Sequence, residues 1–315
     1  CRQRAAGKKK KSSAKVTITE TAETTETFED VTATADVPGR PLGREAQETA
    51  SDRVYHWVGK SPEFGSKCFE SLQRYFPDAM PAKVVHNRSR FVLEQEFGFE
   101  PGSTLLGSSF CPDEINNQGR DLPVVMRDYY GSVFPMGGLG GVPYVGETGF
   151  AAFSSHVADE GHILVAFGPH VGITEDGEVG KVLRKGQCCN SAACGAVTGA
   201  YGACCAGWTD SAGGDESGYD LQMDYIKRWV SPHVEAISRA ENPMAALTHK
   251  SYEMVKDSMF ASVNTNFGSG YLCLLGGITL NLGEKYPDHF FPLTFELRRE
   301  GHETIDLLHE MRQLR

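Results

Sequence analysis

The run from His162 to Phe167, His-Ile-Leu-Val-Ala-Phe, is the feature that most constrains how this chain can fold. Its apolar residues are consecutive rather than alternating, so a strand formed here must be covered on both faces. Strands of this kind are typical of parallel sheets, whose connecting helices cover both faces. Further strand-like and helix-like segments alternate around the run. We therefore predict an α/β fold with a mostly parallel central sheet flanked by helices.

The remaining sequence gives a coarse order of elements around this strand. Further strands are predicted over 103–110 and 270–282, and the Gly-rich segments 134–141 and 145–153 also have strand-like composition. Helices are predicted from amphipathic spacing and start signals over 51–57, 61–76, 83–97, a segment from about residue 112, 192–206, 221–237, 243–263 and 303–314. Pro232 is expected to break the helix over 221–237.

The chain divides into an N-terminal tail over 1–48 and a single globular domain over 49–315. The tail carries a basic block from Lys8 to Lys11, and the segment from Thr17 to Thr34 is mostly Thr, Glu and Ala. Such a composition offers too little apolar surface to offset the entropy lost on ordering. We expect the tail to be disordered or to fold only against a partner.

Charge and composition exclude two classes of function. A net charge of −10 is opposite in sign to what a nucleic-acid-binding surface needs. No run in the sequence reaches the roughly 18 apolar residues of a membrane-spanning helix. The nine cysteines are odd in number and include adjacent pairs, which does not fit a disulfide scaffold and favours a reducing compartment.

Three candidate metal ligands lie where predicted elements meet. Cys111 follows the strand over 103–110, His170 follows the strand that ends at Phe167, and Cys194 lies at the start of the small-residue helix. Ligands in open α/β sheets bind beyond the carboxyl ends of the strands, so these positions can converge. Two thiolates and an imidazole suit zinc and leave a fourth position open. Taken alone, each residue has an ordinary alternative role. Cys111 can be an inert buried thiol, His170 a hydrogen-bonded loop histidine, and Cys194 a small residue chosen for helix packing.

Asp113, two residues after Cys111, is the candidate catalytic carboxylate. A carboxylate beside the metal, held ionised by a guanidinium, can accept the proton of metal-bound water without becoming a ligand. The arginines that could hold it are Arg120, Arg127 and Arg184, and Arg120 is preferred because it is nearest in sequence. The alternative for Asp113 is a first-turn residue that stabilises a helix N-terminus.

Four segments of the chain carry a resemblance to a known family. They are Cys111-Pro-Asp-Glu-Ile-Asn116, Phe134-Pro-Met-Gly-Gly-Leu-Gly-Gly141, Gly168-Pro-His-Val-Gly172 and Ala193-Cys-Gly-Ala196. Together they resemble the limiting-CO2-inducible proteins B and C (LCIB/LCIC) of green algae, and the likeness extends from about residue 50 to the C-terminus. That family is grouped with the theta-class carbonic anhydrases and is similar to β-carbonic anhydrases in its core. The resemblance implies a β-carbonic-anhydrase-like fold with Zn2+ bound by Cys111, His170 and Cys194.

The same resemblance implies a function. It implies zinc-dependent interconversion of CO2 and bicarbonate in an algal carbon-concentrating mechanism, in the chloroplast stroma around the pyrenoid. The implied assembly is a homodimer that can form larger hetero-oligomers with a paralogue. Zinc would acidify its bound water, and the resulting hydroxide, oriented by an Asp–Arg pair, would attack CO2. The β-type enzymes place the arginine two residues after the aspartate, but Ile115 stands there in this chain. Asp113 is therefore predicted to pair with Arg120.

Further expectations concern residues around the site. The run from Gly137 to Gly141 would let backbone approach the site closely, with Phe134 and Phe153 as apolar walls for CO2. It lacks the Lys-Ser/Thr of a phosphate-binding loop. His156 and His162 are candidates for moving protons out of the site, although histidines at such positions are more commonly surface residues.

Two other functions fit the same residues. One is a non-catalytic or partner-activated zinc-containing scaffold, a bicarbonate-binding subunit of a B/C complex. The other is a thiol-dependent hydrolase that uses Cys111 with His170 and needs no metal.

Overall fold

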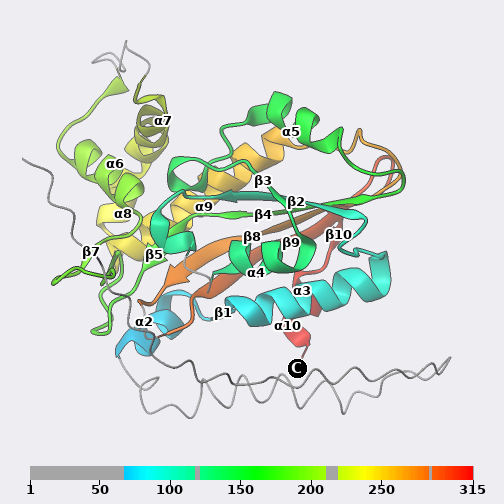
Figure 1. Ribbon diagram of the computed structural model, residues 1–315. Coiled ribbons are helices and arrows are strands. Elements are labelled where there is room, and N and C mark those ends of the chain that lie inside the picture. Colours follow the sequence, from blue (N-terminus) through cyan, green and yellow to red (C-terminus); the bar gives the residue numbers. More distant parts are fainter. Residues whose placement is uncertain (1–66, 118–120, 211–218, 284–285, 315) are drawn as a thin grey trace, which may run out of the picture. The chain divides into compact units, whose positions relative to one another are not determined.

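The computed structural model describes residues 67–117, 121–210, 219–283 and 286–314 (Figure 1). The tail predicted over 1–48, the helix predicted over 51–57 and Arg120 lie outside these residues. The described part is an α/β structure in which helices cover both faces of a central, mostly parallel sheet, as the sequence predicts.

The central sheet has eight strands within the described residues. One side of it is formed by four parallel neighbours, β3 (Val133–Pro135), β2 (Thr104–Phe110), β4 (His162–Gly168) and β8 (Leu272–Asn281). The short β5 (His170–Gly172) follows β4 and pairs in parallel with the end of β8. The antiparallel strands on the other side of β8 are β9 (His289–Arg298), β1 (Met80–Pro81) and β10 (Ile305–Asp306).

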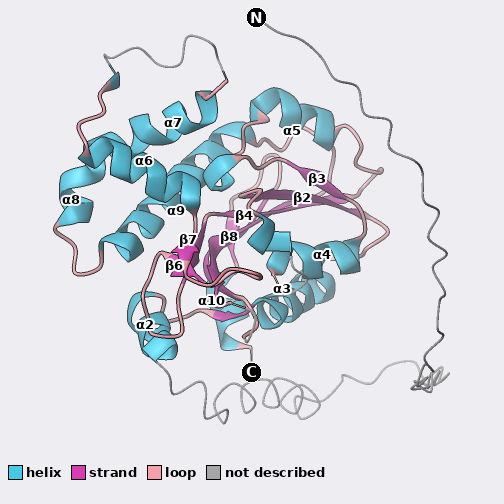
Figure 2. Ribbon diagram, turned by 60° about the vertical axis from the view of Figure 1, so that its left-hand side comes forward, coloured by secondary structure: helices cyan, strands magenta, loops and turns pink. Residues whose placement is uncertain are grey.

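Two layers of helices cover this sheet (Figures 1 and 2). One layer holds α5 (Gly146–Ser154) and α9 (Pro243–Ser262), and the other holds α3 (Ala82–Phe97), α4 (Leu122–Tyr130) and α10 (Leu308–Gln313). Alternate residues of β4 serve the two cores. Val165 and Phe167 pack into one core, and Leu164 and Ala166 pack into the other. This coverage on both faces explains the unbroken apolar sequence of β4.

Further elements gather beyond the carboxyl ends of the parallel strands. They are α2 (Lys67–Tyr75), the two-stranded hairpin of β6 (Lys181–Val182) and β7 (Ser191–Ala192), and the helices α6 (Gly195–Cys205), α7 (Leu221–Val230) and α8 (Val234–Ser238). A 3-10 turn over Ser231–His233 separates α7 from α8, so the break predicted at Pro232 is confirmed.

The predictions for the Gly-rich region are largely wrong. The segment 145–153, expected to be strand-like, forms most of α5, whose Phe150 and Phe153 pack into the core at the helical spacing of three residues. Of the neighbouring segment 134–141, only Phe134 and Pro135 lie in a strand, β3. The helix predicted from about residue 112 is instead the 3-10 turn Glu114–Asn117. Glycine content was a poor guide because these glycines serve turns and close packing rather than extended backbone.

Strand β9 is absent from the sequence predictions. Pro292 in its middle hides the strand pattern, because proline cannot donate to a ladder of hydrogen bonds. The structure accommodates Pro292 opposite Gly277, at a shift in the register of β8 between Gly276 and Gly277. The irregularity therefore absorbs a residue that would otherwise argue against a strand.

Candidate metal centre

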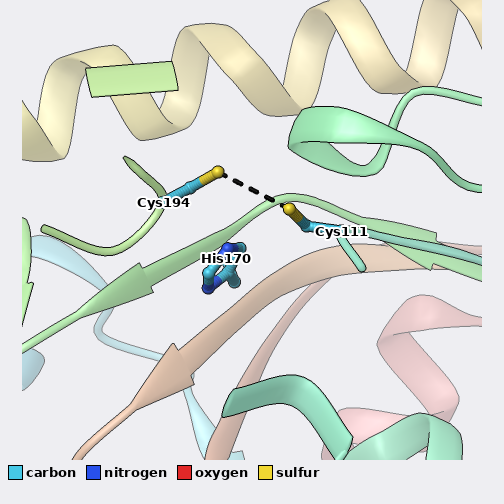
Figure 3. Close-up of side chains that lie close together, drawn as sticks. All are labelled: Cys111, His170 and Cys194. Atoms are coloured by element: carbon cyan, nitrogen blue, oxygen red, sulfur yellow. Dashed lines mark hydrogen bonds between the residues drawn. The ribbon is translucent and has the colours of Figure 1, made fainter. Parts of the chain in front are cut away.

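Cys111, His170 and Cys194 come together at the carboxyl edge of the parallel strands (Figure 3). One ligand atom from each lies within 4.8 Å of the others, and the two sulfur atoms are 3.7 Å apart. All three residues are buried. Cys111 directly follows β2, His170 begins β5, and Cys194 precedes α6. The structure therefore unites the three residues that the sequence placed at separate junctions.

The topology explains why Cys111 and His170 meet. β2 and β4 are parallel neighbours with Phe110 opposite Gly168, so the residues that follow them leave the sheet at the same edge. The Gly-rich run packs directly on both strand ends. A Cβ atom on Gly137 would lie 2.3 Å from the carbonyl oxygen of Phe110, and one on Gly141 would lie 2.3 Å from that of Gly168. Glycine is required at both positions because any side chain would collide with backbone.

The two thiols share a hydrogen bond and have opposite pKa shifts. Hydrogen bonding to Cys111 lowers the pKa of Cys194 against the effect of burial, with further help from the backbone N–H groups of Val197 and Ala196. The same sulfur contact, together with burial, raises the pKa of Cys111. The start of α6 thus favours a thiolate at Cys194, because its amide groups point at the sulfur.

His170 presents one bonded and one unbonded ring nitrogen. Its Nδ1 lies 2.8 Å from Oδ1 of Asn281, whereas its buried Nε2 has no hydrogen-bond partner within the described residues. Burial alone would lower the pKa of His170, but its contacts with Cys111, Asn281 and Asp113 raise it overall. An unpartnered buried nitrogen beside two thiols fits a bound metal ion, and this sulfur and nitrogen donor set suits zinc.

Asp113 lies beside the cluster and is held by Arg184. Nη1 and Nη2 of Arg184 donate to the two carboxylate oxygens at 2.6 and 2.9 Å. Burial would raise the pKa of Asp113, but the hydrogen bonds from Arg184 and the charge of His170 lower it to about 2. Oδ2 of Asp113 is 3.7 Å from Nε2 of His170. The carboxylate is therefore ionised at neutral pH and next to the cluster, but is bound by a guanidinium.

Every N–H group of Arg184 is used. Besides Asp113, the guanidinium donates to Glu114 from Nη1, to the Ser191 hydroxyl from Nε and to the Ala192 carbonyl from Nη2. Arg184 follows β6, and two of these acceptors belong to β7, so the hairpin fixes the side chain from its own two strands. A guanidinium with five bonded donors holds the carboxylate in one orientation.

The arginine preferred on sequence grounds, Arg120, lies outside the described residues. Arg127 points to Asp128 at 3.6 Å on the surface. In the described part of the chain, Asp113 is held by Arg184, which the sequence offered only as a third possibility. Nearness in sequence does not lead to Arg184, since 71 residues separate it from Asp113. The available signal was position, because Arg184 precedes the junction that carries Cys194.

Asp113 also makes a local contact with the backbone, as expected from its alternative interpretation as a residue that stabilises the start of a helical turn. Its Oδ1 accepts a hydrogen bond of 3.3 Å from the backbone N–H of Ile115. The carboxylate thus stabilises the turn that follows Cys111 while it binds Arg184. Asp113 can make both contacts at once, because its two oxygens have room for more than one donor.

The proposed walls and proton carriers do not line the site. Phe134 and Phe153 stack on each other with ring centres 5.0 Å apart, and Phe134 lies opposite Gly107 of β2, roughly 13 Å before Cys111 at the rise of a strand. His162 begins β4 and therefore lies at the opposite end of that strand from His170. His156 is exposed and precedes the same end. Neither histidine is positioned to relay protons from the cluster.

A buried cluster of two cysteines and one histidine at the carboxyl edge of a parallel sheet, with an Asp–Arg pair beside it, defines an α/β protein of the β-carbonic-anhydrase-like class. The family model for limiting CO2-inducible proteins B/C beta carbonic anhydrases matches residues 79–299, and the chain belongs to that family.

Solved structures give the same result for the fold. The chain is similar to the crystal structure of PtLCIB4, a homolog of the limiting CO2-inducible protein LCIB, with a TM-score of 0.67 and 28% identity over 76% of this chain and 98% of that chain. The crystal structure of LCIB matches with a TM-score of 0.57 and 21% identity over 75% of this chain and 97% of that chain. No curated protein matches the chain. Within the described residues, none of the helices is both long and apolar enough to cross a bilayer.

Proposed function

We propose that this chain is a zinc-dependent carbonic anhydrase that interconverts CO2 and bicarbonate, with Cys111, His170 and Cys194 as zinc ligands. The observation that carries the proposal is the pair formed by Asp113 and Arg184 beside this cluster. An unpaired carboxylate at that place could bind the metal and close the site. Because Arg184 donates to both oxygens of Asp113, the carboxylate is restrained, and a zinc ion held by the three ligands would keep a fourth position for substrate.

Zinc, when bound, supplies a Lewis acid that makes a coordinated water acidic near neutral pH. Asp113 supplies orientation. Because its pKa lies at about 2, it is an obligate hydrogen-bond acceptor at neutral pH. It can therefore accept a hydrogen bond from the hydroxyl group that reacts with CO2. This hydrogen bond would orient the hydroxyl so that a lone pair of its oxygen points at CO2. Arg184 keeps Asp113 ionised and in place.

A small cavity lies beside two of the three candidate ligands. A cavity of about 10 Å3 borders His170 and Cys194 and is lined further by Val197, Leu247 and Thr248. A cavity of this volume has room for about one water molecule.

We also propose the chloroplast stroma around the pyrenoid as the location, and a homodimer able to form hetero-oligomers with a paralogue as the assembly. Membership of the family supports both proposals. A non-catalytic scaffold that binds bicarbonate is the main rival function, and it predicts the same metal without turnover.

Stopped-flow measurement of CO2 hydration at alkaline pH separates these functions. The full chain should be loaded with zinc and tested alone and with a paralogue, with Cys111→Ala as the control. We expect hydration well above the rate of the control. A chain that binds zinc but shows no rate above Cys111→Ala under either condition would instead be the scaffold.

A further inference from the structure

We propose that Asn281 is a positioning residue of the metal centre. Its side-chain oxygen accepts the Nδ1–H of His170, which leaves Nε2 unprotonated and available to a metal shared with Cys111 and Cys194. The inference rests on the zinc site of the proposed function, but it does not require turnover. Asn281 ends β8 and is fully buried, 111 residues from His170 in sequence.

The direction of each hydrogen bond follows from a chain that starts at a ligand residue. The backbone carbonyl of Cys111 can only accept, so the atom of Asn116 that lies 3.2 Å from it is the donor Nδ2. The Oδ1 of Asn116 consequently faces Asn281, and the partner there is Nδ2 of Asn281 at 3.2 Å. The remaining atom of Asn281 is its oxygen, and it lies against His170. An oxygen acceptor at this place requires a proton on Nδ1 of His170.

Asp288 fixes the same orientation from a second direction. Its Oδ2 accepts from Nδ2 of Asn281 at 3.1 Å, and its Oδ1 accepts from the backbone N–H of Leu282 at 3.4 Å. Turning the Asn281 amide over would place its oxygen against the oxygens of Asn116 and Asp288. Both of these buried hydrogen bonds would be lost together, which is costly where water cannot replace them.

The unprotonated Nε2 completes the argument at the other side of the ring. This nitrogen is buried and has no hydrogen-bond partner within the described residues. With the proton held on Nδ1, its lone pair is directed away from Asn281. The opposite tautomer would place a proton on the nitrogen that the metal needs. Asn281 therefore acts through His170 rather than on substrate, and two asparagines connect one ligand residue to another.

A substitution series tests this role through metal affinity. Asn281→Leu keeps the approximate shape of the side chain and removes the acceptor. Thr279→Val is a matched control, because Thr279 lies two residues earlier on β8, is buried, and has a hydroxyl without a hydrogen-bond partner within the described residues. Chelator competition should show a loss of zinc affinity of about 10- to 100-fold for Asn281→Leu and wild-type affinity for Thr279→Val. Unchanged affinity in a folded Asn281→Leu variant would overturn the proposal.

The tautomer can be measured in the unaltered chain, so the test survives a variant that fails to fold. In 15N-histidine-labelled protein at alkaline pH, with and without zinc, NMR should show the proton of His170 on Nδ1. His162 is an internal reference, because its Nδ1 accepts the backbone N–H of Tyr271 and its proton therefore lies on Nε2. A proton on Nε2 of His170 would refute the inference.

Its failure is distinguishable from failure of the proposed function. A wild-type chain that binds zinc through a His170 protonated at Nδ1, but does not hydrate CO2, would contradict catalysis and support the role of Asn281. A wild-type chain that hydrates CO2, together with unchanged zinc affinity in Asn281→Leu, would support catalysis and contradict the role of Asn281.

Discussion

His162 and His170 begin two successive strands of the same sheet, and their surroundings assign them opposite roles. His162 stacks on Phe99 with ring centres 4.4 Å apart, and its Nδ1 accepts a backbone N–H. His170 donates from Nδ1 to Asn281, and its Nε2, which has no hydrogen-bond partner in the described part of the chain, faces a buried site that also holds Cys111 and Cys194. Residue type and strand position are similar. The partner of one ring nitrogen separates a packing histidine from a candidate ligand.

The largest expected difference between the two histidines is in metal binding. His170→Ala should abolish stoichiometric zinc and reduce CO2 hydration to background, because only the two sulfurs of the cluster remain. His162→Gln should retain zinc, because its side chain lies at the far end of β4. Elemental analysis of both folded variants checks this. Loss of zinc in His162→Gln, or its retention in His170→Ala, would remove the distinction.

A smaller effect is expected when Arg184 is changed. Arg184→Gln should retain zinc but lower kcat about 100-fold, a size typical for loss of one oriented hydrogen-bonding group, since Asp113 is no longer restrained. The surface change Arg239→Gln, which affects only an exposed pair with Glu235, is the control. The same measurement on Arg120→Gln tests whether Arg120 is instead the arginine that holds Asp113. A loss in Arg120→Gln with none in Arg184→Gln would mean that the pair has been assigned to the wrong arginine.

The pH profile of kcat/KM tests the charge of Asp113. The pKa of this group is about 2, so its ionised form persists through the neutral and mildly acidic range, and it should add no inflection there. Removing the guanidinium in Arg184→Gln should raise that pKa, so activity that depends on ionised Asp113 would fall at a higher pH than in the wild type. Identical acidic limbs in both proteins would contradict this.

The smallest expected effect is on stability near His162. Burial and the charge of Arg299 lower its pKa, so the unfolded chain binds its proton more readily than the folded one. The stability that neutral His162 contributes is present above its unfolded pKa of about 6.5 and is lost as pH falls below that value. His162→Gln should therefore lose less stability on acidification than the wild type, as measured by urea unfolding. Equal losses would place His162 in an environment that does not disfavour its charge.

The sequence predicts the Cys–His–Cys cluster well because the convergence of its residues follows from topology. Consecutive apolar residues require a parallel sheet, and the parallel arrangement brings the residues after β2 and β4 to one edge. Cys111 and His170 are thus linked by a rule that needs no detailed packing. The position of Cys194 was harder to predict, since it depends on how α6 begins.

Arg184 was only one of three candidate arginines, and Asn281 was not predicted, for a physical reason. Arg184 reaches Asp113 only through the hairpin of β6 and β7, and Asn281 reaches His170 only through the register of β8 against β5. These contacts form only when folding brings together residues that are 71 and 111 positions apart in the sequence. No local pattern marks them, because arginine and asparagine are common at exposed positions.

X-ray absorption at the zinc edge tests the central claim most directly, because it reports the atoms around the metal in the full, zinc-loaded chain. We predict two sulfur neighbours at about 2.3 Å, one imidazole nitrogen at about 2.0–2.1 Å and one further light atom. Cys194→Ala should lose one sulfur from this shell. A shell of oxygen alone, or one with no imidazole, would contradict the assignment of Cys111, His170 and Cys194 as the metal centre.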